Sequence, residues 1–167
     1  MYQIGDLVVY GIHGVCKVLE LEIKLINRKK VEYYVLEPLN QEQARFYVPT
    51  QNEAAVAKLR PVLTKQELER LLSSEELSQD AWIADENQRK LYYRELINRG
   101  DRVELIRMVR SLHSHKELQL AQGRKFHLCD ENFLRDAEKL LSSEISLVLN
   151  ISQNEVGTYM QNKLDKK

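Results

Sequence analysis

Cysteine is scarce in this sequence, and long apolar runs are absent. The two cysteines, Cys16 and Cys129, lie far apart and form no CxxC motif, so we expect neither a disulfide framework nor a thiol redox pair. No run approaches the roughly 18 apolar residues that a membrane helix needs. The N-terminal sequence MYQIGDLVVYGIHG also lacks the basic-then-apolar order of a secretory signal. We therefore expect a cytoplasmic protein without a membrane segment.

Glycine is also scarce, at 6 of 167 residues, and its placement argues against a nucleotide-binding loop. Gly11 and Gly14 form the only close pair, and no further Gly or Lys-Ser/Thr follows them as in phosphate-binding loops. Nucleophilic catalysis needs a Ser or Cys supported by a His and a carboxylate, and no such motif is visible. The sequence therefore predicts neither an enzyme nor a bound cofactor.

Two histidine-containing pairs raise the question of a metal site. They are His113 with His115 and His127 with Cys129, and the two pairs would have to meet in space to hold zinc. Their spacing matches no standard zinc module, and His113 and His115 point to different sides of a helix. We therefore expect no bound metal.

The charges balance overall but are distributed unevenly. Lys and Arg number 25, as do Asp and Glu, so the formal net charge is zero. Residues 61–80 hold 2 basic and 5 acidic side chains, whereas residues 81–128 hold 10 basic and 6 acidic ones. Zero net charge argues against a protein that searches DNA alone, and a basic stretch is by itself usually a solvated face.

The first third of the chain has the pattern of short β-strands. β-Branched and aromatic residues dominate residues 7–10, 14–26, 31–39 and 44–49, with turn-forming residues between them. Four or five strands in so short a stretch favour a strongly bent sheet that curls into an SH3-like or Tudor-like barrel. We assign residues 1–60 to this domain, with Pro49 and Pro61 around its exit.

After Pro61 the apolar residues recur with the helical period of 3.6. Three capping pairs mark helix starts: Thr64 with Glu67, Asp101 with Glu104, and Ser152 with Glu155. Two more helices are predicted at about residues 86–98, ended by Gly100, and 130–149. The expected fold class is therefore α+β, with a small β domain followed by an all-α domain of about five helices over residues 61–167.

Trp82 is the only tryptophan, and it lies among polar residues at the start of the helical region. One interpretation is a core anchor under the first helices. The other is an exposed wedge that leans on an unstacked base step in a widened minor groove. Several basic residues follow it and suit phosphate contacts, which position a protein without reading sequence: Arg89, Lys90, Arg94, Arg99, Arg102, Arg107 and Arg110.

A family resemblance rests on segments spread over the whole chain. They are, in order, IGDLVVYGIHGVCKV, VEYYVL, RFYVP, the lone Trp82, INRGD and AEKLLSSEIS. In this order they resemble the CarD family of bacterial transcription regulators that bind RNA polymerase. The resemblance implies a Tudor-like N-terminal domain, similar to the polymerase-interacting module of the transcription-repair coupling ATPase.

The resemblance also implies how the β domain is used. It would dock on the RNA polymerase β subunit by pairing sheet edges. Lys24, Ile26, Arg45 and Tyr47 fall where the family contacts polymerase. Tyr47 stands where an Arg is common, and Arg45, two residues away on the same face, is the expected substitute.

In the helical domain, Trp82 matches the family's Trp, which enters the minor groove at the upstream edge of the melted bubble. Arg89, Lys90, Arg94, Arg99 and Arg102 are the expected backbone contacts. The resemblance therefore implies weak, sequence-independent binding to promoter DNA that stabilises the open complex.

The sequence departs from the family next to this tryptophan. Asp85 and Glu86 stand where relatives often have Arg, which leaves open a polymerase-bound adaptor whose helical domain recruits another protein. An uncharacterised enzyme is a remote third possibility. We expect a monomer, with a dimer formed by strand exchange as the alternative.

Overall fold

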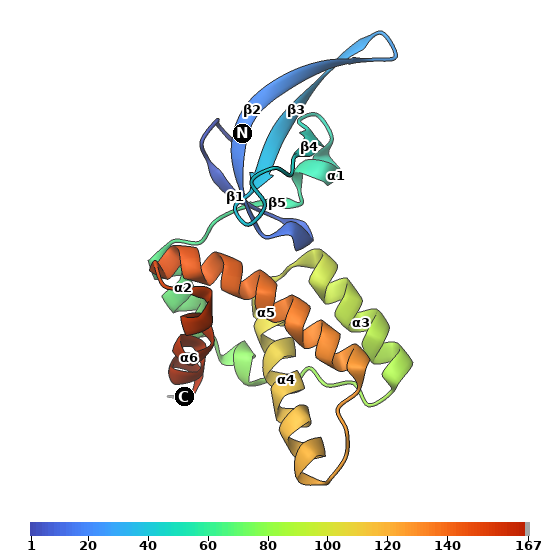
Figure 1. The fold of residues 1–167 in the computed structure, drawn as a ribbon, viewed down its shortest axis with the longest axis vertical. Helices are drawn as coiled ribbons and strands as arrows, with labels where there is room; N and C mark the ends of the chain where they lie inside the picture. Colours follow the sequence, from blue (N-terminus) through green and yellow to red (C-terminus); the bar gives the residue numbers. More distant parts are fainter. Residues whose placement is uncertain (166–167) are drawn as a thin grey trace. The chain divides into compact units, whose positions relative to one another are not determined.

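The computed structural model describes residues 1–165 and divides into two compact units (Figure 1). The first unit is Met1–Val62, and the second begins at Leu63. The boundary expected from the sequence, after residue 60, lies two residues before this division. Each unit has its own hydrophobic core.

The first unit is an antiparallel five-stranded sheet with the strand order β4-β3-β2-β1-β5. A 3₁₀ turn, η1 (Gly11–His13), follows β1, and a short helix, α1 (Glu53–Val56), precedes β5. The strands are β1 (Leu7–Tyr10), β2 (Val15–Ile26), β3 (Lys29–Pro38), β4 (Phe46–Pro49) and β5 (Leu59–Pro61). The four predicted strands are confirmed to within two residues at each end, and β5 is the additional one.

Two local features shape the long β2–β3 hairpin. Its turn consists of Asn27 and Arg28, which both have positive φ, at 49° and 65°; this is the conformation that two-residue hairpin turns require. A bulge between Val18 and Glu20 shifts the register by one residue, so the side chains on β2 change faces there. Before the bulge Val18 points into the core, and after it Leu21 lies on that face opposite Tyr34.

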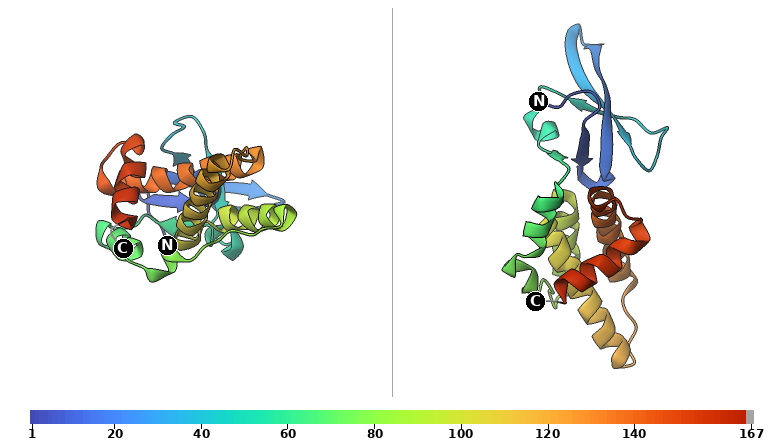
Figure 2. Two further views of the ribbon diagram at one scale, coloured as in Figure 1. Left: turned by 90° about the horizontal axis from the view of Figure 1, so that it is seen from below. Right: turned by 90° about the vertical axis from the view of Figure 1, so that its left-hand side faces the viewer.

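The second unit is helical. Five α-helices and one 3₁₀ segment, η2 (Glu75–Ser78), occur among its described residues. The two longest helices, α4 and α5, lie side by side (Figures 1 and 2). The helices are α2 (Lys65–Leu72), α3 (Glu86–Arg99), α4 (Arg102–Ala121), α5 (Leu128–Leu149) and α6 (Gln153–Leu164).

The helix boundaries follow the capping signals in the sequence. The Thr64 side chain accepts a hydrogen bond from Glu67 N–H, and the Glu67 carboxylate accepts one from Thr64 N–H. Asp101 caps α4, and Gly100, at φ 65°, ends α3 in the left-handed conformation that costs glycine least. The α+β class, with a β domain followed by about five helices, is thus confirmed. Among the described residues, no helix combines the length and apolar character needed to cross a bilayer.

Candidate functional site

Two of the predicted polymerase contacts, Lys24 and Tyr47, lie on one face of the sheet formed by β2, β3 and β4. The register places Lys24 opposite Val31, and Tyr47 opposite Val35, so all four side chains lie on the same face. The Lys24 ammonium lies 3.7 Å from the centre of the Tyr47 ring, a cation–π contact. Lys24 and Tyr47, far apart in sequence, therefore form a single surface feature.

Arg45 lies just before β4 and is engaged within its own loop. Its guanidinium forms an ion pair with Glu37 and donates hydrogen bonds to the carbonyl oxygens of Glu42, at 2.8 Å, and Ala44, at 2.9 Å. Ile26, the last residue of β2, is exposed. The Lys24 ammonium lies 3.8 Å from the Glu22 carboxylate, a longer contact than those of Arg45, so Lys24 is the less constrained of the two.

The outer edge of β2 is open over most of its length. β1 pairs with β2 only from Val15 to Lys17, and the next backbone hydrogen bonds on that edge join Val18 to Gly5 and Asp6. From residue 20 to residue 26, no strand of the described chain pairs with this edge, and in Figure 1 the hairpin extends past β1 and β4. Such an edge presents unpaired N–H and C=O groups to a further strand.

In the helical unit, Trp82 lies in the loop before α3, between two planar side chains. The His115 ring stacks on the indole, with centroids 3.9 Å apart and an angle of 13° between the planes. The Arg89 guanidinium carbon lies 4.1 Å from the ring centre. Two planar groups this close cannot share one indole face, so they occupy opposite faces. Trp82 is thus half-buried, and a partner can contact only the edge of its ring.

Arg89, which packs against the Trp82 ring, is itself buried. It lies on α3 and is only 3% exposed, and its partner Asp130 on α5 is 1% exposed. Two parallel hydrogen bonds join them, from Nε at 2.9 Å and from Nη2 at 2.8 Å, and Nη1 donates to the Ile83 carbonyl at 2.9 Å. The prediction that Arg89 contacts DNA phosphates does not fit this placement, because the guanidinium is buried and each of its three nitrogens already donates a hydrogen bond. Arg89 instead packs against the Trp82 ring and holds it in position.

The loop that carries Trp82 is fixed by hydrogen bonds. Ala81 N–H donates to the Ser111 hydroxyl at 2.7 Å, the buried Tyr93 hydroxyl donates to the Ala81 carbonyl at 3.0 Å, and Trp82 N–H donates to Asp80 at 3.1 Å. Hydrogen bonds from Ser111 and from Trp82 N–H hold the pKa of Asp80 below its usual value. The indole is therefore held in place before any partner arrives.

The other predicted DNA contacts differ in their exposure and in the ion pairs that their side chains form. Lys90 pairs with Glu86 at 2.9 Å, one helical turn away. Arg99 is exposed and pairs with Glu104, also at 2.9 Å. Arg102 is mostly buried and bonds Glu144 through two nitrogens, at 2.8 Å and 2.6 Å.

Arg94, also on α3, is exposed and differs from its neighbours in its pairing. None of the ion pairs found in the described part of the chain includes it. Of the five predicted arginines and lysines, the accessible ones are therefore Lys90, Arg94 and Arg99. A carboxylate holds Arg102, as it does Arg89.

Both acidic residues next to Trp82 have structural roles in α3. Asp85 is the N-cap, and its carboxylate accepts a hydrogen bond from Gln88 N–H at 2.8 Å. The hydrogen bond from Lys90 lowers the pKa of Glu86, which lies in the first turn. Negative charge is favoured there by the helix dipole and by the unpaired N–H groups. Asp85 and Glu86, where the sequence departs from the family pattern, thus stabilise the N-terminus of α3, the helix that carries Arg89.

Two members of the Trp82 site, His115 and Asp130, are not predicted as such from the sequence. As a zinc ligand His115 would act together with His113, but His113 contacts Glu138 on α5 instead. No group of three or more His, Cys, Asp or Glu side chains suited to a metal ion occurs among the described residues. Only the helical spacing of Arg89 with Tyr93 and Leu96, which form the buried face of α3, signals that this basic residue lies inside.

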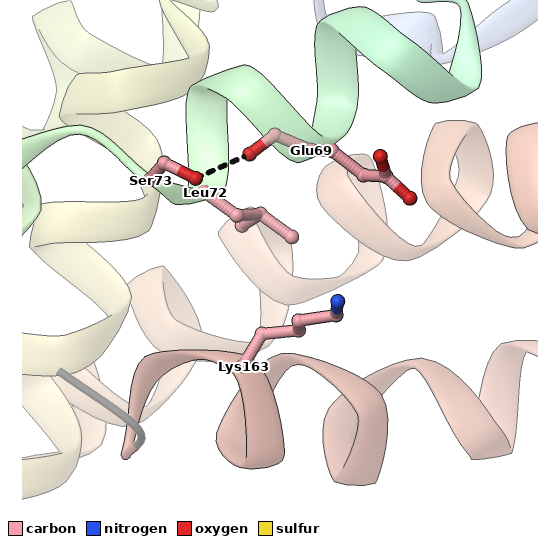
Figure 3. A pocket seen from close by; sticks show the side chains of 4 residues that line it. All are labelled: Glu69, Leu72, Ser73 and Lys163. Carbon is pink, nitrogen blue, oxygen red and sulfur yellow. Dashed lines mark hydrogen bonds between the residues drawn. The ribbon is translucent and has the colours of Figure 1, made fainter.

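A shallow pocket between α2 and α6 is lined by Glu69, Leu72, Ser73 and Lys163 (Figure 3). The Ser73 hydroxyl donates a hydrogen bond to the Glu69 carbonyl at 2.9 Å, as serine hydroxyls do at many helix ends. The remaining polar groups are an exposed carboxylate and an exposed ammonium. Two such groups on a shallow surface favour no particular ligand or reaction.

Comparison with known families identifies both units. Residues 2–63 match the CarD-like/TRCF RID domain, and residues 67–161 match the CarD C-terminal domain. The chain belongs to the CarD family. No curated protein sequence matched the chain. CarD-family proteins are non-enzymatic transcription regulators that interact with RNA polymerase, so the resemblance seen in the sequence is confirmed at the level of the family and its two domains.

Proposed function

We propose that this CarD-family protein binds the β subunit of RNA polymerase through its sheet and stabilises the promoter open complex through Trp82. The observation that carries the proposal is the Trp82 stack. An indole clamped between His115 and Arg89 on a hydrogen-bonded loop is poised to insert its edge without further ordering. The protein would act in the bacterial cytoplasm, as one copy per polymerase.

The open edge of β2 is the proposed polymerase contact. An incoming strand of the β subunit would extend the sheet along residues 20–26, with main-chain hydrogen bonds giving affinity and side chains giving specificity. Lys24 and Ile26 lie on that edge strand, and Tyr47 lies on the same face of the sheet on β4, where its ring contacts the Lys24 ammonium. Because Glu37 already holds Arg45, Lys24 would supply the positive charge that the family usually places at position 47.

The DNA contact combines Trp82 with the accessible cations. Lys90, Arg94 and Arg99 are the proposed phosphate contacts, and Arg89 and Arg102 are left out because carboxylates hold them. Three phosphate contacts predict a slope of about −3 for log affinity against log salt concentration. Binding to DNA alone would therefore be weak, and polymerase would deliver the protein to its promoter.

The proposed mechanism is thermodynamic. If the indole edge meets a base step only when the upstream edge of the bubble is melted, the protein binds the open complex more tightly than the closed one. A difference of about 1.4 kcal/mol in binding free energy shifts the equilibrium tenfold. Holding the side chain ready beforehand lowers the entropy cost of the contact.

The second candidate is a polymerase-bound adaptor, and Asp85 and Glu86 beside Trp82 are the observation in its favour. The two carboxylates give this end of α3 a negative charge that suits a basic protein partner. Their roles in starting α3 explain their presence without such a partner. We therefore keep promoter DNA as the first candidate.

Footprinting of polymerase on a promoter separates the two candidates. The proposal predicts added protection at the upstream edge of the bubble with the wild-type protein, and its loss with Trp82→Ala while polymerase binding persists. Arg135→Ala, which removes an exposed cation on α5, serves as the matched control and should keep the protection. Polymerase binding without any added protection would favour the adaptor.

A further inference from the structure

An apolar row on β2 has no role in the proposed contacts. Leu21, Ile23 and Leu25 are 38%, 63% and 71% exposed. They lie on the face opposite Lys24. Leu21 still faces the core residue Tyr34, but Ile23 and Leu25 stand opposite Glu32 and Lys30 on β3, beyond the end of the core. Three aliphatic side chains in a row on an open edge strand are costly to leave in water.

The segment from Leu21 to Leu25 is complementary to itself. When two copies of a strand pair about a twofold axis, residues of the same face must stand opposite each other. With the axis at Ile23, Leu21 meets Leu25 of the second copy, and Glu22 meets Lys24 of the second copy. With the axis at Glu22 or at Lys24, two like charges would meet at the centre. An axis at Leu21 would place Glu20 opposite Glu22, and an axis at Leu25 would place Lys24 opposite Ile26. Of these axes, only the one at Ile23 brings opposite charges together without also opposing like charges.

We propose that this protein self-associates by antiparallel pairing of β2 with β2 of a second copy, centred on Ile23. The pairing joins two rows of three aliphatic side chains on one face and forms two Glu22–Lys24 pairs on the other. Main-chain hydrogen bonds between the two edges satisfy groups that are otherwise unpaired. No strand is exchanged, and the twofold symmetry closes the assembly at two copies.

The dimer has a functional consequence that rests on the proposed function. It covers the same β2 edge that the polymerase β subunit would extend, so the protein would be free to bind polymerase only as a monomer. An interface of one short strand from each copy is small, and such contacts are weak. Polymerase would therefore displace the second copy, and the free pool of the factor would be buffered at high concentration.

Sedimentation equilibrium of the full-length protein over a wide concentration range tests the pairing. Glu22→Lys and Lys24→Glu each replace two opposite-charge pairs by two like-charge pairs, and each should raise the dissociation constant by about tenfold or more. The double variant Glu22→Lys/Lys24→Glu restores both pairs and should self-associate like the wild type. An equal mixture of the two single variants should form mixed dimers. Lys58→Glu, an exposed site elsewhere in the β unit with the same charge change, is the control and should match the wild type.

Several outcomes would overturn the proposal. A wild-type protein that stays monomeric at all concentrations excludes the dimer, and single variants that associate like the wild type exclude this register. Circular dichroism of each variant verifies its fold. Polymerase added to the dimer should give a complex with one copy of the protein, and a complex that holds two copies refutes the masking of the edge. Failure of polymerase to bind the wild-type protein at concentrations where it is monomeric overturns both the masking and the proposed function, whereas sedimentation judges self-association alone.

Discussion

Replacing Arg89 by Ala should destabilise the helical unit far more than replacing its neighbour Lys90. Without Arg89, the Asp130 carboxylate is left buried at 1% exposure with no cation beside it. Removing one partner of a buried ion pair costs about 3 to 5 kcal/mol. Lys90 is partly exposed, and its ion pair among the described residues is with Glu86 on the same helix, so Lys90→Ala should cost about 0.5 kcal/mol or less.

Urea unfolding followed by tryptophan fluorescence measures this difference. Trp82 is the only tryptophan in the chain, so its emission reports on the helical unit and on the stack itself. In thermal unfolding of a domain of this size, a loss of about 3 kcal/mol corresponds to a fall of roughly 10 °C or more in melting temperature. An Arg89→Ala variant as stable as Lys90→Ala would refute the conclusion that Arg89 is a buried support. The double variant Arg89→Met/Asp130→Leu, which removes both charges, should recover much of the loss.

Three further predictions concern single side chains. The hydrogen bond with Glu138 raises the pKa of His113, so the pair stabilises the fold fully below about pH 6.5 and loses its effect as pH rises through the raised pKa. Both groups are about half exposed, so the gain is at most about 1 kcal/mol; NMR titration of His113 should show its pKa fall in Glu138→Gln, and an unchanged pKa would contradict the pairing. Burial raises the pKa of Cys16 to about 11, so a thiol reagent at pH 8 should label Cys129 first in the native protein, and equal rates would contradict the burial of Cys16. Trp82→Ala should cost about 2 kcal/mol, less than a fully buried Trp. Urea unfolding of this variant is followed by circular dichroism because it has no tryptophan, and a loss below about 0.5 kcal/mol would mean that the ring is free.

The sequence is sufficient to predict most of the fold, because the two periodicities and the capping residues act locally. Thr64, Asp101 and Gly100 mark helix ends through groups within four residues of themselves. β5 escapes prediction because three residues, Leu59–Pro61, carry no alternation and gain their place only by pairing with β1. The reach of the β2–β3 hairpin beyond its neighbours also depends on partners distant in sequence, and no local pattern records it.

The site is only partly predictable for the same reason. Trp82 stands out as a lone tryptophan, but its two stacking partners lie 7 and 33 residues along the chain. A basic residue is usually solvated, so the sequence alone groups Arg89 with the surface cations. Its buried partner, Asp130, is 41 residues away on another helix. A cation that continues an apolar helical stripe, as Arg89 does with Tyr93 and Leu96, is the signal that a buried acid pairs with it.

The most direct test of the proposed function is the lifetime of the open complex on a promoter where that complex is short-lived. Cognate polymerase is compared with no factor, with the wild-type protein and with Trp82→Ala of verified fold at equal polymerase occupancy. We predict a longer lifetime with the wild-type protein and a lifetime close to that of polymerase alone with Trp82→Ala. An equal lengthening by both proteins would contradict the role of Trp82, and no lengthening by either, with polymerase bound, would contradict stabilisation of the open complex.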